Sequence, residues 1–518
     1  MQYPYNNFYE AVANNARQNP KKTLLFFQKQ KISNEAFKKQ VDIFAGFLEI
    51  SGIEAGDRVA IIMGNSIEFA ISFFAITKIK AIAVPINNFL TQHEFEYILN
   101  DCSAKMLITQ TSLATHTQKL QQTTTVSKVV LSGEVSDLQK DNYSFDTIIS
   151  HATAATKAHE NATGTKPTLE DTACIVYTSG TTGKPKGAML SYKGILSNAF
   201  CAKEVFDIHT KDRFLLFLPM FHSFTLSIML ILPVVTNSSI IVIRSVFPFA
   251  NVLKQALFKR ATVFLGVPTL YNALVKAKIP WYFRWFHCIR VFISGSAPLS
   301  EDVINRFHKK FTNAQLLEGY GLSECSPAVS VNRIKWQKPL SVGLPFPGYA
   351  VKIVDDEEVE VAVGEVGEII VKGDCVMQGY INRPEATKET ISNGWLKTGD
   401  LGKLDSDGFL YIVDRKKDLI ISKGLNIYPR EIEEELYKVE GVEAAAVIGI
   451  KDSSGDEKAV AFIQLVENAS VDELQIKQYL KTKLSSFKIP KKIHFVDELP
   501  KNAMGKVLKR VLKEQVNG

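Results

Sequence analysis

Short apolar runs alternate with helical patterns along most of this chain, and this alternation constrains the fold more than any other feature. Val59-Ala60-Ile61-Ile62, Met106-Leu107-Ile108, Ile240-Ile241-Val242 and Val291-Phe292-Ile293 are four such runs. Uninterrupted apolar runs of this kind are typical of strands that are buried on both faces. Because such strands pack between layers of helices, the pattern predicts an α/β fold.

The chain is too long for one compact core, so we expect at least two domains among its 518 residues. From about residue 341 to 413 the pattern changes to short β-rich segments separated by Gly and Asp turns, which predicts a small β subdomain. Five consecutive charged residues, Asp414 to Asp418, cannot form part of a core strand and predict an exposed hinge. The N-terminal domain would therefore cover residues 1–413, and the C-terminal domain residues 419–518.

The segment after the hinge predicts a small α+β domain. We expect helices and strands in the order helix, strand, strand, helix, strand, at Pro429–Tyr437, Ala444–Ile450, Lys458–Leu465, Val471–Leu484 and Lys492–Val496. About a hundred residues in this pattern are enough to form a separate core.

Composition excludes several classes of protein. Apolar residues make up 46% and charged residues 22%, which is typical of a globular protein and not of a disordered chain. The six cysteines contain no C-x-x-C pair and the nine histidines form no ligand cluster, so we expect neither a disulfide framework nor a zinc site. Residues 1–20 lack a secretory signal. A cytoplasmic location is the expectation.

The net charge of +7 is concentrated at one end of the chain. The last 38 residues hold ten basic and three acidic residues, whereas the first 480 hold 51 of each. A surplus confined to one end gives no case for a protein that coats nucleic acid, and no nucleic-acid partner is predicted.

Two segments raise the question of a membrane. Phe214 to Ile243 contains no charged residue, but Pro219, Pro233 and a polar run interrupt it, so we expect a strand, a loop, a buried helix and a second strand instead of a membrane span. The second segment is the aromatic run Trp281 to Phe286. We favour a partly buried cluster there; the alternative is a patch that touches a membrane, which would place the protein peripherally at the inner membrane face.

The strongest motif is a Gly- and hydroxyl-rich loop between two apolar segments. It reads Thr178-Ser179-Gly180-Thr181-Thr182-Gly183-Lys184-Pro185-Lys186-Gly187. Glycines allow a close backbone approach to a ligand, and backbone N–H groups, hydroxyls and lysines together suit a polyphosphate. The spacing does not fit the Walker pattern.

This loop resembles the phosphate loop of the adenylate-forming superfamily, which includes acyl-CoA synthetases, coumarate–CoA ligases, luciferase and peptide-synthetase adenylation domains. Further motifs follow in the order of that family: Ser294-Gly295-Ser296-Ala297-Pro298-Leu299, Gly319-Tyr320-Gly321-Leu322-Ser323-Glu324, Trp395-Leu396-Lys397-Thr398-Gly399-Asp400, Asp414-Arg415-Lys416-Lys417-Asp418 and Pro500-Lys501-Asn502-Ala503-Met504-Gly505-Lys506. Six motifs between Thr178 and Lys506 make the resemblance specific.

The resemblance implies a set of residues that bind ATP and a catalytic lysine. Lys506 would contact the carboxylate and the α-phosphate, where it would stabilise developing charge. Glu324 and Thr181 would hold Mg²⁺, and Ser323 stands where the family has a Thr that touches phosphate. The ATP or AMP site would comprise Thr178, Ser179, Gly180, Thr181, Thr182, Gly183, Lys184, Lys186, Gly295, Ser296, Ala297, Pro298, Gly319, Tyr320, Gly321, Asp400, Arg415 and Lys417.

Individual members of this set have distinct implied roles. The ring of Tyr320 would stack on adenine, and Asp400 would accept both ribose hydroxyls with support from Arg415. Lys417 occupies the hinge position, about which the small domain would rotate between two steps. After rotation, Ser422, Lys423 and Gly424 would line the channel for CoA.

The acyl-binding residues implied by the resemblance are His222, Phe221, Phe224 and Gly321, with Val267 and Leu270 as apolar neighbours. Acetate-activating relatives carry Trp at the position of Gly321, so a glycine there predicts an acid longer than propionate. Apolar neighbours suit an alkyl chain.

The predicted function is ATP-dependent activation of a medium- or long-chain fatty acid to an acyl-adenylate, followed by transfer to CoA. ATP, Mg²⁺, CoA and a small carboxylic acid are the implied ligands. An aryl acid such as a coumarate, an acyl carrier protein as acceptor, a luciferase-like oxidase and a non-catalytic nucleotide-binding protein stay open as alternatives. The basic C-terminal segment is interpreted as the electropositive face of the mobile domain, with Lys488, Lys491 and Lys492 facing CoA phosphates as a hypothesis.

Overall fold

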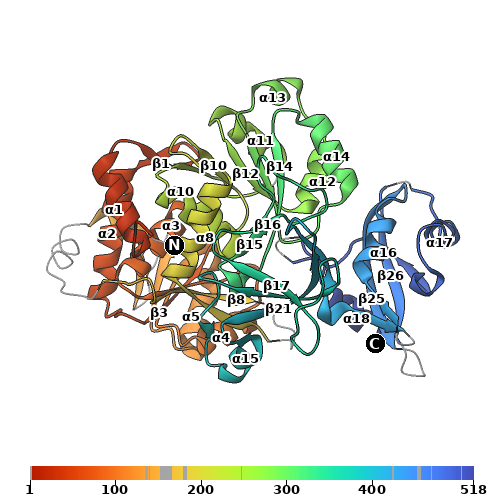
Figure 1. Cartoon of the computed structure of the whole chain (residues 1–518). Helices are drawn as coiled ribbons and strands as arrows, with labels where there is room; N and C mark the ends of the chain where they lie inside the picture. Colours follow the sequence, from red (N-terminus) through yellow and green to blue (C-terminus); the bar gives the residue numbers. More distant parts are fainter. Residues whose placement is uncertain are drawn as a thin grey trace.

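The computed structural model describes residues 3–134, 138, 141–151, 166–178, 184–246, 248–422, 425–451, 457–467, 469–502 and 505–517. A large N-terminal α/β body carries a smaller C-terminal body at one side (Figure 1). The predicted class, a large α/β domain with a β subdomain and a small α+β domain, is confirmed.

A nine-stranded sheet forms one half of the large body, in the order β16-β15-β14-β13-β12-β10-β11-β1-β2. The strands from β14 through β1 run parallel, and antiparallel neighbours extend the sheet at both ends. Their bounds are β16 (Leu344–Pro345), β15 (Ala328–Val331), β14 (Gln315–Gly321), β13 (Val291–Ser294), β12 (Val263–Gly266), β10 (Arg213–Leu216), β11 (Ser239–Val242), β1 (Thr23–Phe27) and β2 (Gln30–Ser33).

An eight-stranded sheet forms the other half, in the order β19-β9-β8-β4-β3-β5-β6-β7. Only its β19-β9-β8 end is antiparallel. Its strands are β19 (Gly379–Tyr380), β9 (Lys186–Ser191), β8 (Thr172–Thr178), β4 (Ile82–Pro85), β3 (Arg58–Ile62), β5 (Met106–Gln110), β6 (Lys128–Ser132) and β7 (Asn142–Ser144).

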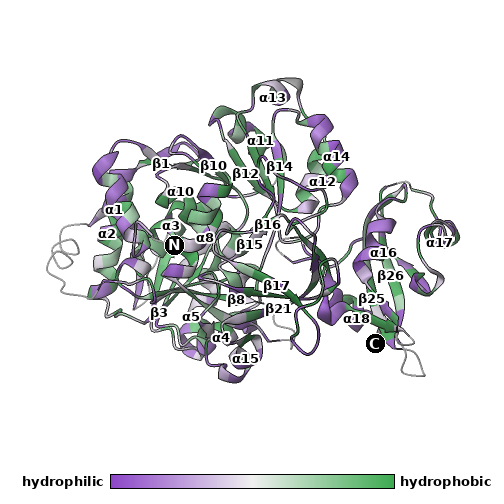
Figure 2. Cartoon of the chain, in the orientation of Figure 1, coloured by the Kyte–Doolittle hydropathy of each residue, from purple (hydrophilic) through white to green (hydrophobic). Residues whose placement is uncertain are grey.

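Helices cover these two sheets. Hydrophobic residues are concentrated along the strands and in α3 and α10, whereas α14 is largely hydrophilic (Figure 2). The helices of the large body are α1 (Phe8–Gln18), α2 (Asn34–Ile50), α3 (Ile67–Lys78), α4 (Gln92–Asp101), η1 (Thr111–Leu113), α5 (Ala114–Thr123), α6 (Phe145–Ser150), α8 (Tyr192–Val205), α9 (Ser223–Thr225), η2 (Leu226–Ile231), α10 (Leu232–Val235), α11 (Phe249–Phe258), α12 (Pro268–Lys276), α13 (Trp281–Phe286), α14 (Glu301–Lys310), η3 (Ser323–Cys325) and α15 (Pro384–Thr390).

The uncharged segment from Phe214 to Ile243 folds as predicted. It contains most of β10, a loop, the buried helical stretch α9-η2-α10 and β11. In the described part of the chain, no helix has the length and apolar character that a membrane span requires.

The β subdomain is a five-stranded antiparallel sheet. It contains β17 (Ala350–Val354), β18 (Gly367–Lys372), β21 (Trp395–Leu404), β20 (Ile391–Ser392) and β22 (Leu410–Arg415). Two short strands from the same stretch of sequence, β16 and β19, instead extend the two large sheets. The subdomain is thereby attached to both halves of the large body.

The C-terminal body begins after the short helix η4 (Lys416–Asp418). Its sheet has the order β25-β26-β27, with β26 and β27 parallel. The elements are β23 (Ile420–Ser422), β24 (Leu425–Ile427), α16 (Pro429–Leu436), β25 (Val442–Lys451), β26 (Glu457–Leu465), α17 (Glu473–Lys481), η5 (Ser486–Lys488), β27 (Lys492–Phe495) and α18 (Lys509–Asn517).

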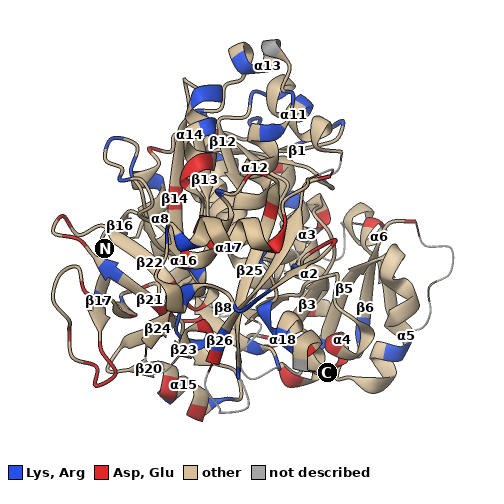
Figure 3. Ribbon diagram, turned by 90° about the vertical axis from the view of Figure 1, so that its right-hand side faces the viewer, with Lys and Arg blue, Asp and Glu red and all other residues tan. Residues whose placement is uncertain are grey.

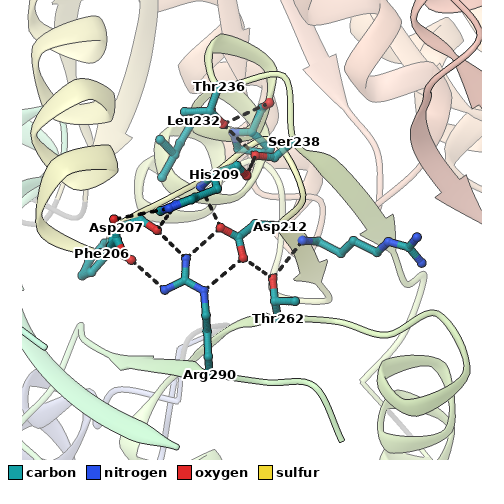
Figure 4. A network of polar contacts seen from close by, with 11 residues as sticks. Phe206, Asp207, His209, Asp212, Leu232, Thr236, Ser238, Thr262 and Arg290 are labelled. Carbon is teal, nitrogen blue, oxygen red and sulfur yellow. Dashed lines mark hydrogen bonds and ion pairs between the residues drawn. The ribbon is translucent and has the colours of Figure 1, made fainter. Parts of the chain in front are cut away.

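One polar network joins the amino ends of three central strands (Figure 4). Asp212, just before β10, accepts hydrogen bonds from the Thr262 hydroxyl at 2.6 Å and from Arg290 Nη2 at 2.7 Å. Arg290 also donates to the carbonyls of Phe206 and Asp207, at the end of α8. The network fixes the register of β10, β12 and β13, and so fixes the position of the opposite, carboxyl edge of the sheet.

Candidate active site

Three predicted segments lie at the carboxyl edge of the nine-stranded sheet. Because β10, β13 and β14 are parallel within one sheet, the segments that follow them meet there. Contact between two of them is close: a Cβ at Gly295 would lie 2.9 Å from the Phe224 ring. The residues of the adenine-side segment therefore lie beside the predicted acyl-binding segment.

The predicted phosphate loop joins β8 to β9, and Ser179, Gly180, Thr181, Thr182 and Gly183 lie outside the described residues. Its two ends are paired, Thr178 with Lys186. Lys184 Nζ lies 5.6 Å from the centre of the Tyr97 ring. Lys186 Nζ lies 5.2 Å from the centre of the Tyr380 ring, so aromatic faces border both lysines.

Glu324 is held by hydroxyl groups from two distant segments. Oε1 accepts hydrogen bonds from Thr178 Oγ1 at 3.3 Å and from Tyr380 OH at 2.9 Å. Burial, together with the adjacent Glu324 charge, raises the pKa of Tyr380, which keeps the phenol a donor. Ser323, next in the chain, has its hydroxyl 2.9 Å from that of Ser223. Sequence reasoning missed Tyr380, because a tyrosine in a two-residue strand carries no motif or spacing signal of its own.

Asp400 is the centre of a second polar group. It is 3% exposed and accepts a hydrogen bond from Tyr320 OH at 2.7 Å. Arg415 Nε lies 2.9 Å from Asp400 Oδ1. Burial opposes the Arg415 charge, but Asp400 together with Tyr320, Asp418 and Glu324 outweighs burial and raises the pKa of the guanidinium. The Tyr320 hydroxyl thus holds the Asp400 carboxylate in place, in addition to the role predicted for the Tyr320 ring.

Lys506 reaches this group from the C-terminal body. It lies in a tight turn between Lys501 and Val507, in which its backbone N–H donates to Asn502 Oδ1 at 2.9 Å. Burial, reinforced by Arg415, lowers the pKa of Lys506 to about 8, while Asp400 and Asp418 act in the opposite direction. Lys506, from the last motif, and Asp400, from the motif Trp395 to Asp400, therefore influence each other electrostatically.

One cavity of about 2060 Å³ connects these groups. Its polar lining includes Tyr320, Glu324, Arg415 and Lys506, with Gly295, Ser296, Gly319 and Lys417. Asp400, which contacts Tyr320 and Arg415, does not itself line the cavity. Ala297 and Pro298 complete the same turn after β13 without lining the cavity. Its apolar lining includes Phe206, Phe221, Ile228, Ile293, Val331 and Phe346.

His222 and Phe224 also line the cavity. Burial lowers the pKa of His222 to about 4, so its imidazole is neutral at pH 7. His222 Nδ1 accepts a hydrogen bond from the Phe224 backbone at 3.3 Å, which leaves the ring proton on Nε2. Val267 and Leu270, expected as neighbours of an alkyl chain, are not part of the described cavity wall.

Gly321 lines the cavity, and the close approach of a neighbouring backbone also restricts this position to glycine. A Cβ there would lie 2.0 Å from the carbonyl oxygen of Pro327, at the point where β14 and β15 pair. The absence of a side chain at residue 321 is thus needed for close approach of two backbones, in addition to leaving space in the cavity.

Of the residues assigned to CoA, Ser422 is described, and it does not line the cavity in this orientation of the domains. Ser422 is buried in β23, where Lys458 Nζ approaches its hydroxyl at 3.5 Å, and Lys423 and Gly424 lie outside the described residues. Lys488 forms an ion pair of 2.7 Å with Glu431. Its charge is therefore compensated within the C-terminal body.

The carboxylates of the site suit a metal that is bound together with a substrate. Across the described residues there is no group of three or more His, Cys, Asp or Glu side chains that could hold an ion. Glu324 with the neighbouring Thr178 hydroxyl provides only part of an oxygen ligand set. A Mg²⁺ ion commonly takes its remaining ligands from phosphate and water, so the residues present fit that metal with ATP and not alone.

Fold and site define an adenylate-forming enzyme, and comparison with known sequences agrees. Residues 12–381 match the family described as AMP-binding enzyme, and residues 431–506 match the AMP-binding enzyme C-terminal domain. The chain belongs to the AMP-binding enzyme family, so the family resemblance predicted from its motifs is confirmed.

Relatives of the whole chain are similar in length and domain content. A long-chain-fatty-acid–CoA ligase of Bacillus subtilis is 34% identical, covering 99% of this chain and 95% of the relative. A feruloyl-CoA synthase of an Amycolatopsis species is 32% identical, covering 95% and 96%. The crystal structure of ATP-bound MatB from Rhodopseudomonas palustris matches with a TM-score of 0.87 at 31% identity, covering 99% of both chains. The apo form of that protein matches with a TM-score of 0.77.

Proposed function

We propose that the protein activates a medium- or long-chain fatty acid with ATP and transfers the acyl group to CoA, releasing AMP and pyrophosphate. One observation carries the proposal: a single cavity is lined by Glu324, Arg415 and Lys506 together with apolar side chains that suit an alkyl chain. The name of the Bacillus subtilis relative supports the same substrate class.

In the first step, a carboxylate oxygen of the acid attacks the α-phosphorus of ATP, and the bond to the β-phosphate breaks. Lys506, protonated below its pKa of about 8, would neutralise charge on the acid and on the α-phosphate. Asp400 and Arg415 would hold the ribose, and the ring of Tyr320 the adenine. Lys184 and Lys186, with the loop between β8 and β9, would hold the polyphosphate.

Mg²⁺, when bound, would neutralise charge on the departing pyrophosphate. Glu324 is the carboxylate we assign to it, with Thr181 as its partner in the phosphate loop. The hydroxyls of Thr178 and Tyr380 would orient Glu324 toward the metal. Ser323 would supply the hydroxyl that contacts phosphate.

In the second step, the CoA thiolate attacks the acyl carbonyl, and AMP leaves with the electron pair of the broken C–O bond. We infer that the C-terminal domain rotates about Lys417 before this step, which would withdraw Lys506 and bring Ser422, Lys423 and Gly424 to the cavity. The orientation described here corresponds to the first step, because Lys506 lies beside Asp400 and Arg415. The higher TM-score with ATP-bound than with apo MatB supports that assignment.

The apolar side chains that line the cavity support a fatty acid as the substrate. The side chains of Phe206, Phe346 and Val331 offer no polar partner for a ring hydroxyl, whereas they suit methylene groups. His222 is neutral and would border the acyl carbonyl without adding charge.

The proposal is tested by ATP–pyrophosphate exchange with acetate, octanoate, palmitate and coumarate, followed by thioester formation with CoA. We expect octanoate or palmitate to give the highest kcat/KM, and Lys506→Ala to reduce exchange by at least about 100-fold, because it removes a charge that acts in the transition state. Preference for coumarate would favour an aryl-acid ligase. Exchange without CoA-dependent product would favour a carrier protein as acceptor, and unchanged exchange in Lys506→Ala would exclude the mechanism.

A further inference from the structure

One continuous stretch of the chain contains no acidic residue. From Arg213 to Ser300 there are nine Lys or Arg and no Asp or Glu over 88 residues, although the chain as a whole has 54 acidic residues in 518 and would place about nine in such a stretch. The stretch includes α11, α12 and α13. Blue segments surround the top of the molecule on α11, α13 and α14, and red appears lower, near β13 and β14 (Figure 3).

Large aromatic side chains project from the same part of the molecule. Trp285 and Phe286 on α13 are 77% and 65% exposed, and Phe258 at the end of the neighbouring α11 is 74% exposed. Phe283, on the same short helix, is 2% exposed and stacks on His287, which anchors α13 to the body. The aromatic residues are therefore presented outward on a helix whose inner side is fixed.

Exposed cations surround these aromatic residues. We call the whole surface the aromatic-basic face; it consists of Phe258, Trp285 and Phe286 with Lys254, Arg260, Lys276, Lys278 and Arg284. Within the described residues, none of the five basic side chains forms an ion pair. Burial, and then the nearby Arg284, lower the pKa of Lys310 at the end of α14.

The first acidic residues after this stretch of sequence, Glu301 and Asp302 at the start of α14, interact with other basic residues. Asp302 pairs with Arg306 on its own helix at 2.9 Å. Glu301 lies close enough to Lys438 of the C-terminal body to raise the pKa of that lysine, after the hydrogen bond of Lys438 to Glu435. Neither acid neutralises the aromatic-basic face.

We propose that the aromatic-basic face docks the protein on the surface of an anionic phospholipid bilayer. Indole and phenyl rings partition into the interface between headgroups and acyl chains, and each nearby Lys or Arg adds attraction to anionic lipid. A second copy of the chain fits less well, because pairing two such faces would bring like charges together.

This surface is separate from the catalytic cavity. The segment that follows α13 leads to the amino end of β13, whereas the cavity lies at the carboxyl end of the same strand. Docking therefore goes beyond the proposed function and is measured without ATP, acid or CoA.

The test is cosedimentation of the whole protein with vesicles of phosphatidylethanolamine and phosphatidylglycerol in a 3:1 ratio, against vesicles of phosphatidylcholine alone, at low and high salt. We expect binding to the anionic vesicles that weakens with salt. Each basic side chain near an anionic surface contributes about fivefold, so Lys276→Glu/Lys278→Glu/Arg284→Glu should reduce the partition coefficient by at least about 100-fold. Trp285→Ser/Phe286→Ser should reduce it by about tenfold or more.

Matched controls lie in the C-terminal body. Leu474→Ser removes a side chain that is 64% exposed on α17, and Lys451→Glu/Lys481→Glu/Lys483→Glu reverses three exposed lysines of the same body. Both should change binding by less than about twofold, and all variants should keep the wild-type circular dichroism spectrum and exchange rate. The proposal is overturned by equal binding to both lipids, by equal losses in the controls, or by concentration-dependent dimerisation that the triple reversal abolishes while vesicles stay unbound.

Discussion

At the scale of single residues, Glu324 shows how a site carboxylate is oriented. Thr178 precedes the phosphate loop and Tyr380 lies some two hundred residues further on, yet both donate to Glu324 Oε1. We predict that Tyr380→Phe lowers the adenylation rate by about 10- to 100-fold and raises the Mg²⁺ concentration needed for half-maximal rate, because an outer hydroxyl fixes the ligand. A titration of exchange rate against Mg²⁺ measures both effects.

The matched control is Tyr411→Phe, whose hydroxyl approaches Asp405 at 3.4 Å away from the cavity. It should leave the Mg²⁺ titration unchanged. If Tyr380→Phe lowered only thermal stability and left the Mg²⁺ dependence as in the wild type, the tyrosine would be merely structural.

The partly buried Lys506, which we assign to catalysis, lowers the free energy of unfolding of the ligand-free protein. Burial lowers its pKa from 10.5 to about 8, so between these values the unfolded chain holds a proton that the folded chain has lost. The free energy of unfolding therefore rises as the pH increases through this window, and the full penalty applies below pH 8. We predict that Lys506→Met stabilises the ligand-free protein by about 1–3 kcal/mol at pH 7 and removes this rise.

Urea unfolding of wild type and Lys506→Met from pH 7 to 10 measures the effect. Exchange in the wild type should fall above pH 8, as the lysine loses its charge. Lys501→Met, in the same turn, is the control and should keep the wild-type pH profile. A parallel stability profile for wild type and Lys506→Met would contradict the burial of a charged amine.

At the scale of elements, the network around Asp212 determines how three strands align (Figure 4). Burial would raise the pKa of Asp212, but hydrogen bonds from Arg290, Thr262 and the His209 backbone outweigh it and lower the pKa. The contribution to stability is therefore present above the ordinary value of 3.8 and is lost as the pH falls through the lowered pKa. We predict that Asp212→Ala costs about 2–4 kcal/mol at pH 7.

Denaturant unfolding at pH 7 and below pH 4 checks the sign, since the difference from wild type should shrink on acidification. Asp302→Ala breaks an exposed pair with Arg306 and should cost less than about 1 kcal/mol at either pH. A difference for Asp212→Ala that grew at low pH would contradict the assignment of a charged aspartate.

Individual elements also show how far local sequence specifies structure. The helix predicted at Val471–Leu484 is shorter, Glu473–Lys481, because Asp472 and Gln475 form a capping box that fixes its start. The strands expected at Ala444–Ile450 and Lys458–Leu465 are longer by three residues and one residue, respectively, and form a paired hairpin. Pairing with a neighbouring strand extends a strand beyond its apolar run. The local pattern of apolar residues does not show which strand that neighbour is.

At the scale of the whole molecule, the C-terminal body is docked through a few contacts. Arg430 Nη1 donates to the Ile412 carbonyl at 2.6 Å. Gly505, at φ +76°, lies so near the large body that a Cβ would be 2.8 Å from Thr269 Oγ1. We predict that Gly505→Ala lowers adenylation by at least about tenfold, because a strained turn and a clash displace Lys506, while transfer from added acyl-adenylate to CoA is retained.

Separate assays of the two half-reactions test this. Gly364→Ala is the control, since it introduces the same unfavourable φ, +92°, with nothing within 4 Å of the new Cβ. It should leave both half-reactions unchanged. Equal loss of both half-reactions in Gly505→Ala would indicate general misfolding instead of displaced docking.

The sequence by itself determined the fold class, the order of elements and the family. These follow from apolar periodicity and from motifs that are contiguous in the chain, such as the loop around Thr178 and the turn before Lys506. Charge patterning likewise predicted an exposed hinge at Asp414–Asp418, because a run of charges cannot be buried.

Only the tertiary structure decided which side chains meet. Tyr380 reaches Glu324, Lys506 lies beside Asp400 and Arg415, and Val267 and Leu270 are left out of the cavity wall. Gly321 proved to be limited by the backbone of Pro327 as well as by the space that an acid requires. Such contacts join residues far apart in the chain, and their energies depend on distance and burial, which sequence separation does not encode.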